Sequence, residues 1–380
     1  MTNILLAARD GGGTAAVEIR VARRLVEHGH HVRVIGTRGV CDAAAGLDVT
    51  LVKDAEPAAL ATRLLDELDG IEIVVADCML YGALIAATVR GVPSVALMPT
   101  VYLADRLAGS KLATQPHWTR VRENINTARS RFGLPPITSV GDQILESTKV
   151  LVLTSRAFEL PDVQPPPHVV YVGPQLDDAQ DWNPPEASNP LVLVSLSTSD
   201  QGQDDLLQRL LTALGRLPVH ALVTVGPAVD PATLDAPDNV TVERFLPHSS
   251  VLPHAALVVT HAGHGTVLSA LRAGVPLVCI PMGRDQYDVT ERVRHHGAGI
   301  SLPDDADILR LADGISSVLA EPKFTSAARR LAAMIADQDP NQVVEEIVGT
   351  QRGIHGIHAR GAGAGGATRA AGAAAGWARN

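Results

Sequence analysis

The amino-acid sequence predicts an α/β fold built from two doubly wound, Rossmann-like domains that face each other across a cleft. Short apolar runs alternate with amphipathic helical patterns, the alternation stops in an irregular stretch, and it then begins again. The chain has 380 residues, which is enough for two domains of ordinary size. In open parallel sheets a ligand binds outside the carboxyl ends of the strands, so we expect the functional site between the two sheets.

The first domain is predicted to span residues 1–171. Its apolar runs predict strands at residues 3–8, 30–37, 71–77, 93–99 and 149–155. Residues 14–29 have helical spacing, with Val17, Val21, Ala22 and Leu25 on one face. A run of small residues predicts another helix at 82–91, and residues 103–136 are mostly helical in pattern.

Residues 172–190 are rich in Pro, Asp and Asn and lack periodicity, so they are predicted to link the two domains. The second domain, residues 191–350, repeats the alternation. We expect its strands at 191–197, 219–226, 254–260 and 276–281, and its helices at 204–217, from Thr266 and from about Asp285. Residues 351–380 are rich in Gly and Ala, can bury little surface and are expected to be disordered.

The composition argues against several classes of protein. A formal net charge of -9 is unlike that of a general nucleic-acid-binding protein, which usually carries a basic stripe. Three scattered cysteines, Cys41, Cys78 and Cys279, fit a reducing compartment better than a disulfide framework. The sequence shows no signal-peptide pattern and no apolar run long enough to span a bilayer. We therefore expect a cytoplasmic protein whose partners are small molecules, with no membrane contact.

The stretch HAGHGT, residues 261–266, predicts a site for a phosphate. It follows an apolar strand and leads into a helix that is expected to begin near Gly265 or Thr266, so free amides and the positive end of the helix dipole face the strand end. Gly263 and Gly265 let the backbone approach a phosphate, Thr266 offers a hydroxyl, and His261 offers a ring N–H. The alternative is a glycine-rich turn with a capping threonine.

Asp285 and Gln286 follow the next predicted strand and reach the same edge of the sheet. A carboxylate beside an amide can hold the vicinal hydroxyls of a sugar. The alternative is that Asp285 caps the helix that begins there, and one side chain can do both.

These motifs, HAGHGT, the Gly-Val-Pro turn and the Asp-Gln pair, together resemble the donor-binding motif of GT-B nucleotide-sugar glycosyltransferases of family 1. The resemblance is to the antibiotic and macrolide type found in actinomycetes. It extends to about residue 350 and is strongest between 240 and 300. It implies inverting transfer of a sugar, for instance a deoxysugar, from a dTDP- or UDP-sugar to a small natural-product aglycone. A nucleotide sugar is then the co-substrate and no cofactor is expected.

The resemblance also implies roles for individual residues. Phe245 would stack on the nucleobase, the backbone of Leu246 would bond the base edge, and His248 would lie near the ribose. The phosphates would lie against His264 of the HAGHGT motif. They would also lie near Ser197 and Thr198, two hydroxyl residues at the end of the first strand of the second domain.

No metal is expected, because a helix N-terminus and a histidine can carry the developing diphosphate charge. The acidic stretch from Asp305 to Asp307 superficially matches a carboxylate pair that binds a metal. It precedes a helical pattern, so it is interpreted as a helix cap.

The resemblance fails at the start of the first helix. Many relatives carry a histidine or aspartate there as the general base, and this chain has Thr14, which is not a competent base at neutral pH. Three alternatives remain open. Asp10 in the glycine-rich loop acts as the base; or Asp77, after the third strand, acts directly or through water; or the acceptor needs little deprotonation. We slightly favour Asp10.

Other functions stay open at this point. The missing histidine favours a non-catalytic auxiliary partner of a true glycosyltransferase, and an epimerase of the same fold would bind a nucleotide sugar without an acceptor. A dehydrogenase is disfavoured, because Asp10–Gly13 lacks the spaced glycines of a dinucleotide site. A homodimer is a further open hypothesis. Residues from about 50 to 145 are expected to line the aglycone pocket.

Overall fold

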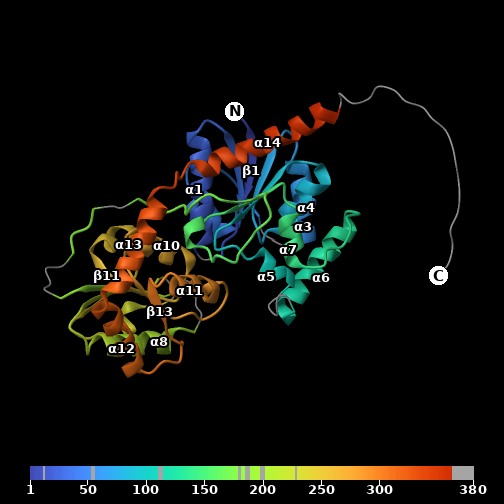
Figure 1. Cartoon of the computed structure of the whole chain (residues 1–380). Coiled ribbons are helices and arrows are strands. Elements are labelled where there is room, and N and C mark those ends of the chain that lie inside the picture. The colour runs from blue at the N-terminus through green and yellow to red at the C-terminus, as the bar shows by residue number, and fades with distance from the viewer. Residues whose placement is uncertain are drawn as a thin grey trace, which may run out of the picture.

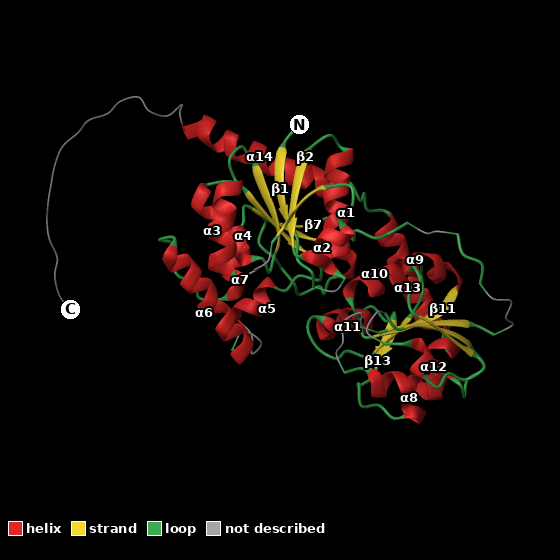
Figure 2. Cartoon of the chain, turned by 180° about the vertical axis from the view of Figure 1, so that it is seen from behind, coloured by secondary structure: helices red, strands yellow, loops and turns green. Residues whose placement is uncertain are grey.

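The structure is a computed structural model, and it describes residues 1–11, 13–52, 56–109, 114–178, 181–184, 189–196, 202–226 and 229–361, without the side chains of 352–361. The described residues form two sheets in which every strand pair is parallel (Figure 2). Each sheet has helices on both faces, and the predicted fold class is confirmed. None of the described helices is long and apolar enough to cross a membrane.

The first sheet has the strand order β3-β2-β1-β4-β5-β6-β7. Its strands are β1 (Asn3–Ala7), β2 (His31–Gly36), β3 (Asp48–Leu51), β4 (Ile73–Asp77), β5 (Ser94–Met98), β6 (Lys149–Val152) and β7 (Val169–Tyr171). The helices around it are α1 (Thr14–Glu27), α2 (Arg38–Ala43), α3 (Pro57–Glu67), α4 (Tyr81–Arg90), α5 (Ala104–Gly109), α6 (Pro116–Arg131) and α7 (Val140–Leu145).

The second sheet has the order β10-β9-β8-β11-β12-β13. Its strands are β8 (Leu191–Ser195), β9 (His220–Thr224), β10 (Val240–Glu243), β11 (Ala255–Thr260), β12 (Leu277–Cys279) and β13 (Gly299–Ser301). The helices that follow these strands are α8 (Asp204–Leu214), α9 (His248–Val251), α10 (His264–Arg272), α11 (Gln286–His295), α12 (Ile308–Ala320) and α13 (Pro322–Ala336).

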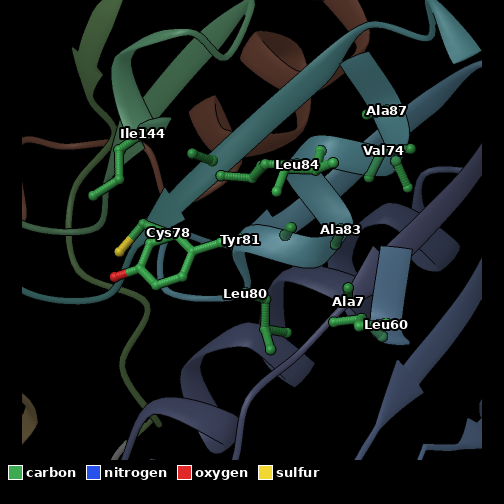
Figure 3. Packing of buried hydrophobic residues seen from close by; sticks show 14 of the residues in the cluster. Ala7, Leu60, Val74, Cys78, Leu80, Tyr81, Ala83, Leu84, Ala87 and Ile144 are labelled. Atoms are coloured by element: carbon green, nitrogen blue, oxygen red, sulfur yellow. The ribbon is translucent and has the colours of Figure 1, made fainter. Parts of the chain in front are cut away.

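Small side chains allow the helices to lie close to the first sheet. Figure 3 shows Ala83, Leu84 and Ala87 of α4 in one cluster with Val74 of β4 and Leu60 of α3, and all five are buried. A Cβ added to Gly82 would lie 2.6 Å from the backbone oxygen of Pro57, so α3 and α4 meet almost backbone to backbone. Burial on both faces explains why β4 and β5 are continuous apolar runs without alternation.

The last helix, α14 (Gln342–Gly361), returns to the first domain. Its residues Val343, Val344 and Ile347 are buried in the same cluster as β1 and α1, and Figure 1 shows α14 lying across that domain. The sequence prediction assigned residues up to 350 to the second domain, and an apolar helical stripe does not reveal which sheet it covers. The structure is helical to Gly361, beyond the start of the predicted disordered tail at 351. Residues 362–380 lie outside the described part.

The chain crosses between the domains twice, and α1 holds both crossings. The side-chain oxygen of Gln175, on the first crossing, accepts a hydrogen bond from Arg24 Nε at 3.0 Å, and its backbone oxygen accepts one from Arg20 Nε at 2.8 Å. On the second crossing, Asn341 Oδ1 accepts from Arg24 Nη1 at 3.1 Å. Gln175 also donates to the backbone oxygen of Pro340 at 3.4 Å. The two crossings are therefore fastened to each other and to α1 at one place.

A buried ion pair joins the two domains. Glu159, just after β6 and a short 3₁₀ turn, accepts from Arg292 Nε of α11 at 2.6 Å, and both side chains are almost fully buried. Glu159 also accepts from the hydroxyl of Tyr171 at 2.9 Å. Beside this pair the ring of His296 stacks on Phe158, with ring centroids 5.9 Å apart. These contacts connect the end of α11 to the first domain without intervening water-exposed surface.

We predict that Glu159→Ala strongly destabilises the protein, because it leaves the Arg292 guanidinium buried without its carboxylate. Removing one partner of a buried pair costs about 3–5 kcal/mol. The free energy of unfolding from urea titrations measures the loss. The double variant Glu159→Ala/Arg292→Met is the control: it removes both charges and should recover much of the stability. An equal or larger loss in the double variant would contradict this account.

Candidate active site

The carboxyl edges of the two sheets face each other. Thr100 follows β5 of the first sheet, and its hydroxyl donates to Asp285 Oδ2, which follows β12 of the second sheet. Close by, Arg106 of α5 forms an ion pair with Asp288 of α11. The residues that follow β1, β4 and β11 lie at these same two edges. The sequence motifs that were expected to share a site therefore lie on its two opposing walls.

The HAGHGT loop forms an open helix N-terminus at the edge of the second sheet. Helix α10 begins at His264, one or two residues earlier than predicted, with Gly263 as its N-cap and no side chain capping it. Ala262 has a φ of 67°, a left-handed conformation that is uncommon for alanine and that turns the chain sharply from strand to helix. The first amides of α10 therefore point out of the second sheet at its carboxyl edge.

The ring of His261 lies directly over this N-terminus. A Cβ on Gly263 would lie only 2.7 Å from His261 Nε2, so glycine is needed for the ring to fold back over the loop. By contrast, a Cβ on Gly265 would meet no atom of the described residues within 4 Å. Thr266 is half-buried in the first turn of the helix.

Both histidines of the loop are uncharged at neutral pH. Burial lowers the pKa of His261, which outweighs the opposing effects of the Ser195 backbone and of Asp285. Burial lowers the pKa of His264 to about 4, and the positive charge of Arg292 acts in the same direction. Among the described residues no hydrogen-bond partner faces His264 Nε2. A neutral imidazole has one N–H to donate, which suits a site that takes up an anion.

Asp285 stands at the N-cap of α11, yet its side chain does not cap the helix. Its carboxylate instead accepts from Thr100 across the domain interface. Gln286 is buried, and its Oε1 accepts from the amides of Met282 at 2.7 Å and Gly283 at 3.0 Å. Gln286 therefore holds the loop that presents Asp285, while Asp285 faces the first domain.

The residues assigned to the nucleoside follow β10. Phe245 is 74% exposed, which is unusual for a phenylalanine and leaves its ring face accessible. Leu246 packs partly against the core of the second domain. His248 begins α9, burial lowers its pKa, and its Nε2 lies 3.4 Å from the hydroxyl of Thr224. Ser197 and Thr198 lie outside the described residues.

The acidic stretch from Asp305 to Asp307 is a helix cap, as interpreted from the sequence. Asp307 Oδ1 accepts from the amide of Arg310 at 2.8 Å at the start of α12. Among the described residues no group of three or more His, Cys, Asp or Glu side chains is arranged to hold a metal ion.

On the opposing wall, the three candidates for the acceptor chemistry lie in different environments. Thr14 begins α1, and its hydroxyl donates to the backbone oxygen of Arg9 at 3.0 Å. Asp10 is exposed and turned toward α2, since a Cβ on Gly39 would lie 2.1 Å from Asp10 Oδ2. Asp77, at the end of β4, is fully buried, and its Oδ1 accepts from Arg9 Nε at 3.3 Å and from the amide of Met79 at 2.7 Å.

Sequence reasoning missed two members of this wall, Arg9 and Glu18. Glu18 is fully buried on α1, and its Oε2 accepts from the amide of Arg9 at 2.9 Å. Burial, together with the charge of Asp77, raises the pKa of Glu18 well above its usual value. A carboxylate in the apolar stripe of α1, four residues after Thr14 and so on the same face, was the available signal.

One hollow of about 710 Å³ lies elsewhere, beside the edge strand β13. Its walls include Tyr287, Ser301, Arg310 and Phe324, but neither His261 nor Asp285 nor any residue of the first domain. This hollow therefore does not coincide with the facing edges of the two sheets.

Comparisons with known proteins find relatives of this chain. Residues 208–350 match the family described as erythromycin biosynthesis protein CIII-like, C-terminal domain. The chain is 29% identical over 340 residues to 4'-demethylrebeccamycin synthase of Lentzea aerocolonigenes, covering 80% of this chain and 79% of that protein. It is 28% identical over 375 residues to oleandomycin glycosyltransferase of Streptomyces antibioticus, covering 87% and 86%.

Solved structures show the same fold. The calicheamicin glycosyltransferase CalG4 superimposes with a TM-score of 0.75 at 24% identity, covering 93% of this chain and 99% of that one. The glycosyltransferase VinC, in complex with dTDP, superimposes with a TM-score of 0.70 at 21% identity, covering 92% and 100%.

The fold and these matches define a glycosyltransferase of the GT-B class. Its second domain matches the erythromycin CIII-like family model, and the chain is a glycosyltransferase of the antibiotic-biosynthesis type.

We predict that His264 makes the protein less stable in acid. Its pKa is about 4 in the folded protein and about 6.5 unfolded, so between these values the unfolded chain binds a proton that the folded one does not. Stability therefore falls as the pH drops below 6.5, by about 2 kcal/mol from this group at pH 5. Urea unfolding of the wild type and of His264→Gln at pH 7.5 and pH 5 isolates the effect. If both proteins lose the same stability, His264 is not the group responsible.

Proposed function

We propose that this protein transfers a sugar, of the deoxysugar class, from a dTDP- or UDP-sugar to a small natural-product aglycone, with inversion and without a metal. The observation that carries the proposal is the neutral His261 ring folded over Gly263 at the uncapped N-terminus of α10, opposite the edge of the first sheet. A diphosphate placed there would face amides, the helix dipole and an imidazole N–H.

In this reaction an acceptor oxygen attacks the anomeric carbon, and the nucleoside diphosphate leaves from the opposite face. Negative charge grows on the leaving phosphate. The α10 N-terminus and His261 stabilise that charge through preorganised hydrogen bonds, which is why we propose that no metal is needed. Asp285 would hold hydroxyls of the sugar on the side of the first domain. Phe245, Leu246 and His248 would bind the nucleoside along the same edge.

The proposed base differs from the family pattern. Asp10 stays our first candidate for the general base and Asp77 the second. The contacts of each side chain, however, weigh against its acting as the base. Asp10 points toward Gly39 of α2, and Asp77 is fully buried and accepts a hydrogen bond from Arg9 Nε. The third alternative, an acceptor that needs little deprotonation, gains support from this arrangement.

The aglycone is proposed to lie against the first domain between residues 50 and 145. Val101 and Tyr102, which the sequence places in this range, are buried and not open to a ligand. Trp118 on α6 is only partly buried.

Ligand binding tests the proposal directly. Thermal unfolding is measured with dTDP, UDP, their sugar derivatives and NAD, followed by product detection with candidate aglycones. We expect stabilisation by a nucleoside diphosphate and a glycosylated product. Stabilisation by NAD alone would overturn the proposal. Binding of a nucleotide sugar that is isomerised would indicate an epimerase, and binding without any product would favour an auxiliary partner.

We predict that His261→Ala lowers turnover about 10²–10³-fold, because the donor aimed at the leaving phosphate is lost. Such a donor contributes about 2.7–4 kcal/mol in a transition state. Steady-state kinetics measures the effect. His220→Ala is the matched control, because His220 begins β9 at the opposite edge of the same sheet. Unchanged kinetics in His261→Ala would remove this residue from the mechanism.

We predict that Asp285→Asn weakens binding of the nucleotide sugar while leaving the free nucleoside diphosphate bound nearly as before. The reason is that Asp285 lies on the hydroxyl side of the donor. Calorimetry with both ligands gives the comparison. Thr100→Val removes the other partner of Asp285: if it reproduces the full effect of Asp285→Asn, the carboxylate serves the domain interface and not the sugar.

A further inference from the structure

Arg9 occupies a central place on the acceptor-facing wall. It follows β1, an inner strand of the first sheet that lies between β2 and β4, at the edge that faces the second domain. Its backbone is held on both sides by α1, through the hydroxyl of Thr14 and the carboxyl group of Glu18. Its guanidinium lies under the glycine-rich loop, since a Cβ on Gly11 would lie 2.9 Å from Arg9 Nη2. The position of this side chain is therefore set by the backbone around it.

The guanidinium is oriented from behind by a buried acid pair. Asp77 accepts from its Nε. Two buried carboxyl oxygens, Asp77 Oδ2 and Glu18 Oε1, have no other donor among the described residues. Burial and the charge of Asp77 raise the pKa of Glu18 well above its usual value, which favours the protonated form of Glu18 beside Asp77. Cys78, the other titratable group beside Arg9, is a neutral thiol because burial raises its pKa. Arg9 therefore has one ion-pair partner among the described residues, Asp77, and that carboxylate lies on the Nε side of its guanidinium.

The other side of Arg9 is open. Its side chain is 37% exposed, and its two terminal nitrogens have no acceptor in the part of the chain that the structure describes. The N-terminus of α1 begins a few residues later, with neither a capping side chain nor an acidic residue in its first turn. Two features that favour an anion thus meet here, while the nearest carboxylates are either buried behind Arg9 or turned toward α2.

We propose that Arg9 binds the acceptor oxygen as an anion, so that the natural acceptor is an acidic hydroxyl of the phenol or enol class that ionises without a general base. The proposal rests on the proposed function and deepens it. Arg9 Nε stays on Asp77, and a terminal nitrogen donates to the acceptor oxygen, the two-sided use that a guanidinium fork allows.

The charges balance without a base on the protein. The acceptor releases its proton to water on binding, and its oxyanion forms the new bond to the anomeric carbon. The bond from that carbon to the diphosphate oxygen breaks, and the leaving group takes the negative charge to His261 and α10. An aliphatic alcohol, which is far less acidic than a phenol, gains little from this arrangement.

The experiment uses two nitroaromatic probes with the purified full chain. 4-Nitrophenol ionises with a change of absorbance, and 4-nitrobenzyl alcohol has the same ring with an unionised hydroxyl. With protein in excess, we expect the wild type to lower the apparent pKa of bound 4-nitrophenol by about one unit or more, as a neighbouring guanidinium does for an acid. Arg9→Gln should abolish the shift, and Arg9→Lys should restore part of it.

A second variant protects the test against misfolding. Arg9→Gln leaves Asp77 buried without its cation, so Arg9→Gln/Asp77→Asn replaces the ion pair by two neutral amides and should fold without a phenolate shift. Arg33→Gln is the matched control, because it makes the same change at an arginine of β2 that pairs with Glu67, and it should keep the shift. An equal shift in wild type and in both Arg9 variants would overturn the proposal.

Transfer from UDP-glucose and dTDP-glucose provides the second readout. We expect the nitrophenol to be the better acceptor and its advantage to fall at least 10²-fold in Arg9→Gln. Two results together would also overturn the proposal, in favour of Asp10 as the base. They are transfer to 4-nitrobenzyl alcohol as fast as transfer to 4-nitrophenol, and loss of that transfer in Asp10→Asn. If no nucleoside diphosphate binds, the proposed function fails, while the absorbance titration still decides the role of Arg9.

Discussion

The buried ion pair between Arg292 and Glu159 is the contact on which the geometry of the site depends. Arg292 belongs to α11, the helix that begins directly after Asp285. Its bond to Glu159 fixes α11 to the segment that follows β6 in the first domain. Because the pair is excluded from water, its geometry is narrowly defined. Thr100 and Asp285 meet across the same domain interface, so the ion pair and this hydrogen bond together hold the carboxyl edges of the two sheets face to face.

The two opposing walls of the site differ in the charged groups that they present. On the donor wall, burial lowers the pKa of His261 and His264, so neutral imidazoles and a helix dipole face the site, and the charge of Arg284 lowers the pKa of His261 further. On the acceptor wall, the guanidinium of Arg9 is a fixed cation, its Nε donates to Asp77, and burial raises the pKa of Glu18 beside that pair. A leaving diphosphate and an attacking oxyanion would each meet a wall of suitable polarity, which keeps like charges separated until the bond is made.

The central strands and the donor loop could be predicted from the sequence, because a buried parallel strand is an apolar run and a glycine-rich helix start has an unmistakable composition. The short strands β3, β7, β10 and β13 were missed, since three or four residues carry too little periodicity to separate a strand from a loop. Glu18 was overlooked because helical spacing reports which face is buried, not which polar group is paired there. The return of α14 was equally hidden: Val343 and Ile347 mark a buried stripe, but only the three-dimensional arrangement shows which sheet it covers.

The chain passes between the domains twice, and both connections bond to Arg24. The two domains are therefore not independent, consecutive segments of the chain. The first domain is completed by α14, which follows the second domain in the chain, so a cut in the linker between 172 and 190 would not release two finished halves. The amino-terminal fragment would lack α14 and expose the apolar surface that Val343, Val344 and Ile347 cover. Because Arg24 bonds to Gln175 on one crossing and to Asn341 on the other, both chain connections between the domains lie together against α1.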